Sequence, residues 1–174
     1  MRVRLIAAGA AVVVMGLGVS ASAATARGHA LEGDWGGIVG FHHATVGKGY
    51  WFSCPPLRNT SDLPVEVLKA ELLGAPAHWR TGEFRAARRS DTHGTTLAAY
   101  DVSFAENPDL ARDYSKEAVR IAPGEESPIY YLVRAEVVTS PVSGEAEGCR
   151  VTYRTGNRIH SQVLPTRFEV RAGD

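Results

Sequence analysis

The histidines are the residues of this 174-residue chain whose types and spacing come nearest to a metal site. If the mature chain began at Arg27, its amine, two backbone nitrogens and the imidazole of His29 would supply the four nitrogens of a tetragonal Cu(II) site. His42 and His43 form the only adjacent pair. Neighbouring strand residues point to opposite faces, so we interpret this pair as solvated loop histidines. A copper-binding extracytoplasmic protein that uses His29, His42 and His43 is therefore kept as an alternative hypothesis.

One basic cluster of the chain also contains aromatic residues. Its arginines and the aromatic residues among them are Arg80, Arg85, Arg88, Arg89, Trp79 and Phe84. Such a mixture suits an anionic glycan or another surface polymer. A mobile connecting loop explains the same composition, and we favour the loop.

The carboxylates do not suggest an acid–base pair. Glu125 and Glu126 lie in a turn sequence, and the others are spread along expected strands. A glycosidase needs two facing carboxylates in a cleft, which this spacing does not indicate. The sequence contains no G-x-S-x-G, H-E-x-x-H or phosphate-loop motif. We therefore predict a protein that is not an enzyme and has no cofactor, with an unrecognised hydrolase as the second alternative.

The first residues have the three parts of a cleaved export signal. Arg2 and Arg4 precede an apolar stretch that is shorter than the roughly 20 residues needed to span a bilayer. Small residues then allow cleavage after Ala23 or after Ala26, and only the second cut exposes Arg27 as the N-terminus. We predict a secreted protein with no membrane insertion after cleavage.

The composition narrows the class of partner. The chain has 19 basic and 19 acidic residues, and the signal removes two arginines. Proteins that bind nucleic acid usually have a basic stripe on their surface, so a near-neutral mature domain argues against a nucleic-acid partner. The expected partner is an extracellular protein or a surface polymer.

Cys54 and Cys149 are the only cysteines. In an oxidising compartment an isolated pair indicates one disulfide bond. Free thiols that bind metal or act in redox chemistry are the competing interpretation, but the chain has no C-x-x-C and no histidine beside either cysteine. Trp35, Trp51 and Trp79 suit either core packing or a partner surface, and Trp51 is close enough in sequence to pack over the disulfide.

Hydrophobic residues alternate with polar ones through most of the mature chain. A period of two predicts strands with one buried and one solvated face. Expected strands lie at residues 38–41, 50–54, 65–73, 97–104 and 129–138, around Val151 and around Phe168. In 97–104 the pattern places Tyr100 and Val102 inward and Asp101 outward. Helix is expected only as a single turn near residues 107–114. These elements predict an all-β antiparallel sandwich.

Two turn-and-strand motifs resemble bacterial immunoglobulin-like domains. Residues 59–67 read NTSDLPVEV and resemble an early strand of those domains, and residues 121–126 read IAPGEE and resemble the turn before a central strand. The chain is similar to small secreted immunoglobulin-like proteins of high-GC bacteria. The resemblance covers residues 54–172 and implies an antiparallel immunoglobulin-like β-sandwich without implying an activity.

The expected organisation follows from these observations. Residues 1–23 form the signal peptide, with a possible cut after residue 26, residues 24–53 form a Gly-rich N-terminal segment, and residues 54–172 form the sandwich. The expected function is that of a secreted, non-enzymatic binding or interaction module at or outside the cell surface.

Overall fold

The structure is a computed structural model that describes residues 25–33, 37–92, 98–106 and 108–173. The expected signal peptide, Trp35 and His93 lie outside the described residues. The strands are β1 (Ala26–Arg27), β2 (Leu31–Glu32), β3 (Ile38–Ala44), β4 (Gly49–Ser53), β5 (Arg58–Asn59), β6 (Val65–Leu73), β7 (Trp79–Arg88), β8 (Ala98–Tyr100), β9 (Arg120–Ile121), β10 (Ile129–Val137), β11 (Gly144–Thr155) and β12 (Arg158–Ala172). Two four-residue helices, α1 (Ser103–Glu106) and α2 (Pro108–Ala111), lie between β8 and β9.

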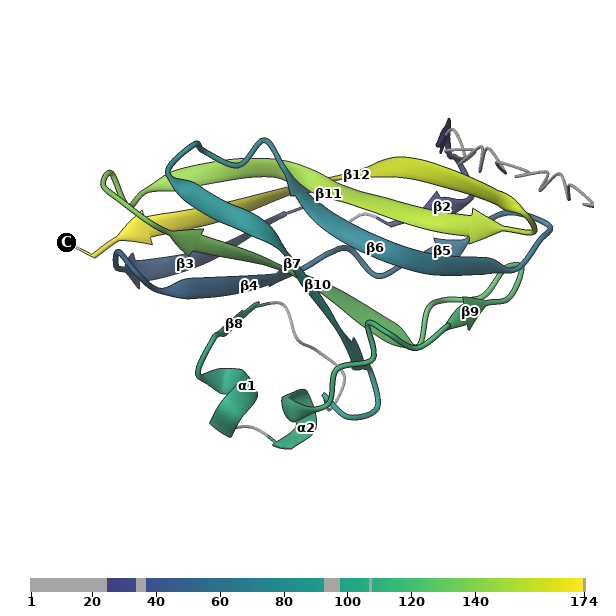
Figure 1. Ribbon diagram of the computed structural model, residues 1–174, viewed down its shortest axis with the longest axis horizontal. Helices are drawn as coiled ribbons and strands as arrows, with labels where there is room; N and C mark the ends of the chain where they lie inside the picture. Colours follow the sequence, from purple (N-terminus) through teal and green to yellow (C-terminus); the bar gives the residue numbers. More distant parts are fainter. Residues whose placement is uncertain (1–24, 34–36, 93–97, 107, 174) are drawn as a thin grey trace, which may run out of the picture.

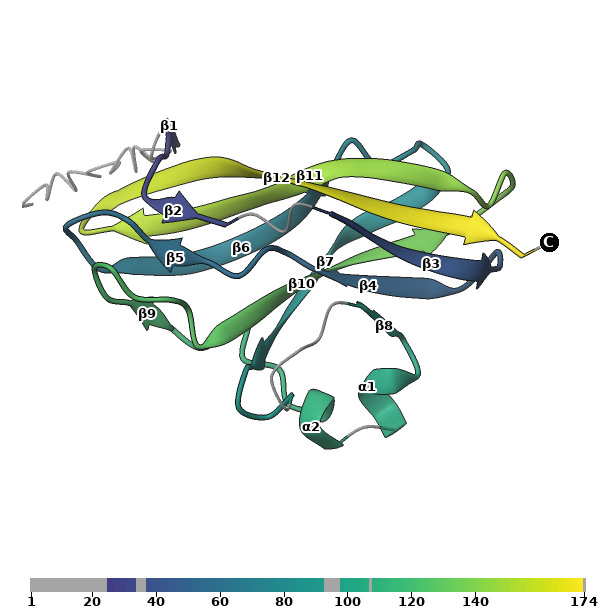
Figure 2. The same ribbon diagram turned by 180° about the vertical axis from the view of Figure 1, so that it is seen from behind.

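The strands form two main sheets that pack as layers (Figure 1). The first sheet has the order β1-β12-β11-β6-β9, and β3 also pairs with β12; the second has the order β7-β10-β4-β8. Pairing is antiparallel except where β1 and β3 run parallel to β12. A short β2–β5 pair lies near one end (Figure 2). The fold is therefore all-β with antiparallel sheets, as the alternating pattern predicted.

Residues from the Gly-rich N-terminal segment take part in both sheets. β3 pairs with β12 in the first sheet, and β4 lies between β10 and β8 in the second. All five residues of β4 are buried. Among the described residues, no helix has both the length and the apolar character needed to cross a bilayer.

Strand β10 shows how the core forms. Ile129, Tyr131 and Val133 share the face that packs into the main core between the sheets, while Arg134 lies on the opposite face, as the alternation predicted. Burial raises the pKa of Tyr131 to about 12, so this phenol stays neutral. The opposite face of β10 is also buried at Leu132, which belongs to a second, smaller core.

The second core lies under the segment that carries α1 and α2, which covers part of the outer face of the second sheet (Figure 1). Phe104 and Leu110 from this segment are buried with Trp51 and Leu132. The rings of Trp51 and Phe104 lie 5.0 Å apart at a steep angle. Trp51 therefore packs in the second core, and the expectation that it packs over the disulfide is wrong.

The expected strand at 97–104 is correct only in part. The strand contains Ala98–Tyr100, and its buried residue is Ala99, whereas Tyr100 and Val102 are 47% and 51% exposed. The chain leaves the sheet at Asp101, whose carboxylate accepts hydrogen bonds from Trp51 and Arg134. Asp101, which was predicted to face solvent, is thus held by two side chains of the second sheet. Helix α1 begins two residues later, at Ser103.

Arg134 lies at the centre of the network that holds Asp101. Its side chain is only 14% exposed, and its guanidinium donates to both carboxylate oxygens of Asp101 at 2.9 and 2.7 Å. It also donates to Glu83 at 2.9 Å and to Glu136 at 3.0 Å. The Arg134 guanidinium holds the pKa of Asp101 below its ordinary value, and Asp101 raises the pKa of Arg134. This network connects β7, β10 and the start of the helical segment.

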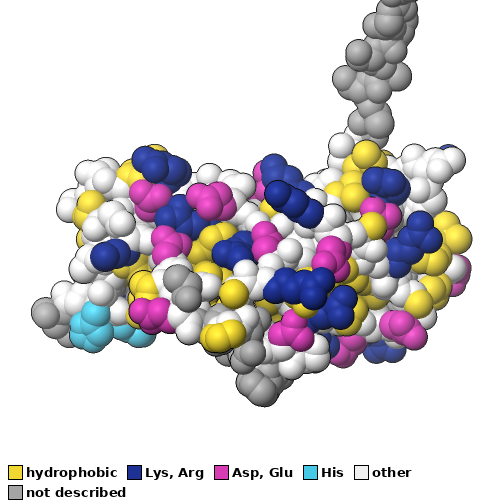
Figure 3. Space-filling view, turned by 60° about the horizontal axis from the view of Figure 1, so that its bottom comes forward, with side chains coloured by type: hydrophobic (Ala, Val, Ile, Leu, Met, Phe, Trp, Pro, Cys, Tyr) yellow, Lys and Arg dark blue, Asp and Glu magenta, His cyan; other side chains and the backbone are white. Residues whose placement is uncertain are grey.

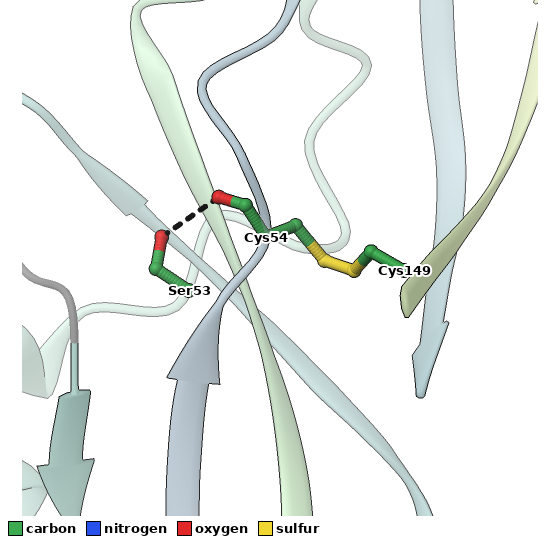
Figure 4. The surroundings of a disulfide bond; sticks show 3 residues. All are labelled: Ser53, Cys54 and Cys149. Carbon is green, nitrogen blue, oxygen red and sulfur yellow. Dashed lines mark hydrogen bonds between the residues drawn. A yellow bond between two sulfur atoms is a disulfide. The ribbon is translucent and has the colours of Figure 1, made fainter. Parts of the chain in front are cut away.

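The predicted disulfide is confirmed. Cys54 directly follows β4 of the second sheet and Cys149 lies in β11 of the first, so the bond joins the two layers (Figure 4). Both cysteines are buried, and the described chain contains no free cysteine. A buried disulfide is consistent with an extracellular protein.

Candidate functional site

The basic cluster of residues 80–89 lies in strand β7 and the residue after it, so the expectation of a mobile loop is wrong. Its arginines have partners within the protein. Arg85 stacks 4.5 Å from the ring centroid of Phe104, Arg88 stacks 4.6 Å from that of Tyr114, and Arg89 bonds to Glu126 at 2.6 Å. Arginine stacks on aromatic faces and also pairs with carboxylates, so Arg85 and Arg88 attach the segment from Phe104 to Tyr114 to the sheet, and Arg89 binds the residues just before β10.

The rest of this face is similarly paired. Arg80 lies 3.4 Å from Glu136. The Arg112 guanidinium lies 4.5 Å from the ring centroid of Tyr114, so this ring contacts both Arg88 and Arg112. Hydrogen bonds from the Ser90 hydroxyl and then from the Tyr114 hydroxyl, the latter at 2.9 Å, lower the pKa of the Asp91 carboxyl. Figure 3 shows basic and acidic side chains interleaved over this side of the molecule. The pKa shifts here are explained by structural contacts.

The structure separates the candidate copper ligands. His42 and His43 are exposed, but they lie in strand β3 and not in a loop as expected; a bulge opposite β12, where His43 has a φ of 61°, places them there. His29 lies instead near the other end of β12, two residues after Arg27, which pairs with Ser161. Twelve residues of strand separate the two places, or roughly 40 Å. Within the described residues, no group of three or more His, Cys, Asp or Glu side chains is placed to hold a metal.

The Arg27–Gly28–His29 segment is itself part of the fold. Gly28 N–H donates to the Ser161 carbonyl at 2.8 Å, and a Cβ built on Gly28 would lie 2.2 Å from the Tyr153 hydroxyl. Only glycine allows this close approach. A copper site of the kind considered above would have to displace the Gly28 hydrogen bond, because it binds the deprotonated backbone nitrogen.

Tyr153 connects this segment to the sheet. Its hydroxyl accepts a hydrogen bond from Ala30 N–H at 3.0 Å, and its ring stacks on His160 with 5.4 Å between centroids. The His160 ring is bonded to Thr155 at 2.9 Å. Gln162 bonds to both backbone groups of Leu31. These contacts fix residues 27–31 against the end of the β11–β12 hairpin.

Three hollows surround the end of this hairpin. The largest has a volume of about 430 Å³, and its neighbours have volumes of about 280 and 360 Å³. We define the hairpin-end site as the residues that line these hollows: Arg27 to Ala30, Ser61 to Pro64, Glu66, Arg120, Tyr153 to Asn157 and His160 to Val163. Leu63 and Val163 are 56% and 53% exposed, more than most large hydrophobic side chains of the protein. An apolar rim and shallow hollows suit a ligand that lies on the surface.

The hairpin-end site is not apparent in the sequence. Tyr153 and His160 belong to no motif and lie on neighbouring strands. The site depends on Ala26 and Arg27 pairing in parallel with His160 and Ser161 of β12, a contact across more than 120 residues. A local indication of the site in the sequence is Gly156, which marks a turn between two alternating segments. In the structure this glycine has a φ of 54°.

Comparison with known proteins does not identify a family. No family model matches the chain, and no curated protein matches it. Among solved structures it is similar to the Vibrio cholerae VesB protease, with a TM-score of 0.38 and 8% sequence identity over 81% of this chain. The chain spans 31% of the length of that protease chain. A likeness of this size carries no argument about activity.

Proposed function

We propose that this protein is a secreted, non-enzymatic binding module whose partner binds at the hairpin-end site. The observation that carries the proposal is the concentration of three adjoining hollows and two exposed apolar side chains, Leu63 and Val163, at one end of the sandwich. Apolar surface that stays exposed beside shaped hollows is typical of interaction sites. The partner is an extracellular protein or a surface polymer.

Export is supported by two independent features. The Arg2 and Arg4 start, the short apolar stretch and the small residues before Ala23 and Ala26 have the pattern of a signal peptide. The buried Cys54–Cys149 bond belongs to proteins that fold under oxidising conditions.

An immunoglobulin-like arrangement is also part of this proposal. In such domains one sheet ends with the last strands of the chain, the other contains the second and fifth strands, and a disulfide joins the second strand to the sixth. The order β3-β12-β11-β6 in one sheet and β7-β10-β4 in the other supports this assignment, as does the bond from the end of β4 to β11. The loops at the ends of such sandwiches commonly carry binding sites.

Co-sedimentation with the isolated envelope of the producing cells tests the proposal. We expect the oxidised mature protein to sediment with the envelope, and Leu63→Ser/Val163→Ser to lower the affinity about fivefold, since two exposed apolar contacts contribute roughly 1 kcal/mol together. The matched control is Val46→Ser/Val138→Ser, which removes two similarly exposed side chains away from the site. Equal losses for the two variants, or no sedimentation of the wild type, would contradict the proposal.

A further inference from the structure

The outer face of the first sheet continues from the hairpin-end site across five strands. Residues opposite one another in a sheet share a face, so the register defines rows of neighbouring side chains. These rows are Arg120, Glu66, Arg154 and Ile159; then Lys69, Thr152, Ser161 and Arg27; then Glu71, Arg150 and Val163. We call these residues the basic half-face, because five of them are basic and two are acidic.

The charges of the basic half-face are incompletely paired. Lys69 bonds to Glu71 at 2.7 Å, and Arg154 reaches Glu66 only at 3.9 Å. Arg27, Arg120 and Arg150 are exposed, and none of their side chains has an ion pair or hydrogen bond with any other residue that the structure describes. The arginines of β7 differ in this respect, since their charges are used within the protein.

The excess of positive charge is confined to part of the same sheet. Beyond the basic half-face, towards the C-terminal end of β12, the charges are nearly balanced, because Glu145, Glu147 and Glu169 lie there with Arg167 and Arg171, and Arg171 bonds to Glu169. A near-neutral protein thus has one region of its surface with an excess of positive charge. The overall composition conceals this excess.

We infer that the basic half-face, acting with the hairpin-end site, binds a linear anionic polymer that carries carboxylate or phosphate groups and is not a nucleic acid. This inference rests on the proposed function and names its partner class. The unpaired arginines give charge complementarity to such a chain, and guanidinium groups bind both kinds of oxyanion through paired N–H donors. Thr152 and Ser161 lie between Lys69 and Arg27 in the middle row, and their hydroxyls supply further donors.

The geometry favours a polymer over a folded acidic protein. Arg27, Arg154 and Arg120 lie on β1, β11 and β9, each two strands from the next, so about 10 Å separates them in the direction across the strands. Arg27 lies one row further along the strands than the other two. The face is an open sheet surface, and its rows contain no tryptophan or tyrosine. Protein interfaces usually depend on large aromatic anchors in pockets, which this face lacks. A repeating chain of anionic groups matches evenly spaced cations.

Titration of the oxidised mature protein with defined polymers tests the inference. Polygalacturonate supplies carboxylates, polyphosphate supplies phosphates, and neutral dextran is the uncharged control. We expect saturable binding of at least one polyanion, with log K falling linearly as log salt rises, and no binding of dextran. Arg120→Gln/Arg150→Gln should weaken the binding roughly three- to thirtyfold and lower the salt slope by about 1.5 to 2.

The matched control removes the same charge elsewhere. Arg80→Gln/Arg167→Gln neutralises one arginine on β7 and one in the other half of the first sheet, and we expect it to change the affinity less than twofold. Equal weakening by both variants shows attraction to net charge alone and overturns the inference. Tighter binding of a DNA duplex than of either polymer also overturns it. If envelope binding persists while no polyanion binds, the inference fails and the proposed function survives.

Discussion

Replacing both Cys54 and Cys149 by alanine is expected to lower the free energy of unfolding by about 3 to 5 kcal/mol, the largest effect of any change considered for this protein. The bond spans 95 residues of sequence and joins the two sheets. Its removal frees a long loop in the unfolded chain, and that entropy gain stabilises the unfolded state. Urea denaturation at neutral pH, followed by circular dichroism, measures the change.

Wild-type protein that has been reduced with dithiothreitol before refolding provides the control. It retains both sulfur atoms, so it separates the cross-link from the loss of side-chain volume in the core. We expect the reduced wild type to lose nearly as much stability as the alanine variant. A loss below about 1 kcal/mol in the reduced protein would show that the bond does not constrain the fold.

Arg134→Met is expected to lower the free energy of unfolding by about 2 to 3 kcal/mol. Methionine keeps the aliphatic part of the side chain but leaves the carboxylates of Asp101, Glu83 and Glu136 without their shared cation. The carboxylates would then repel one another, and the helical segment after Asp101 would lose its anchor to β10. Arg167→Met is the control, because Arg167 is exposed and has no ion pair among the described residues.

The pH dependence of the Arg134→Met effect provides a second measurement. The folded protein lowers the pKa of Asp101 below its ordinary value of 3.8, chiefly through the hydrogen bonds from Arg134. A lowered carboxyl pKa stabilises the folded state above the unfolded pKa, and this contribution disappears as the pH falls through the folded value. The stability difference between wild type and Arg134→Met should therefore be constant from pH 5 to 7 and narrow below about pH 4. A constant difference down to pH 2 would contradict the proposed role.

Much of the fold was accessible from the sequence, because most strands bury one face. The pattern predicted β6 at residues 65–73 and all of β10 with one further residue, and the cysteine count predicted the disulfide. The single-turn helix expected near residue 108 corresponds to α2. Period-two alternation is informative where one face meets the core and the other meets water.

The errors occurred where a side chain has a partner far away in the sequence. Arg85 and Arg88 suggested a solvated loop, because sequence alone does not show that Phe104 and Tyr114 lie over their guanidinium groups. Asp101 appeared to be an ordinary solvent-facing residue until β10 placed Arg134 beside it. The second core was missed for the same reason, since its apolar residues come from β4, β7, β10 and the helical segment.

The candidate site illustrates this limit most clearly. The sequence indicated a basic cluster at residues 80–89, and the structure shows that these charges are used within the protein. The unpaired arginines lie on β1, β9 and β11, which are distant in sequence and meet only through sheet pairing. Arg27, Arg120 and Arg150 are isolated in sequence, so no local pattern marks them.

The most direct test of the account is to locate the bound partner on the surface by NMR. Amide spectra of the ¹⁵N-labelled oxidised protein would be recorded during titration with whichever polyanion binds, or with envelope fragments if neither does. We expect shift changes confined to residues 27–30, 61–71, 120 and 150–163, with β7 and the helical segment unchanged. Changes centred on residues 80–89 or 101–114, with the hairpin-end site unaffected, would contradict the central claim that this end of the sandwich is the binding surface.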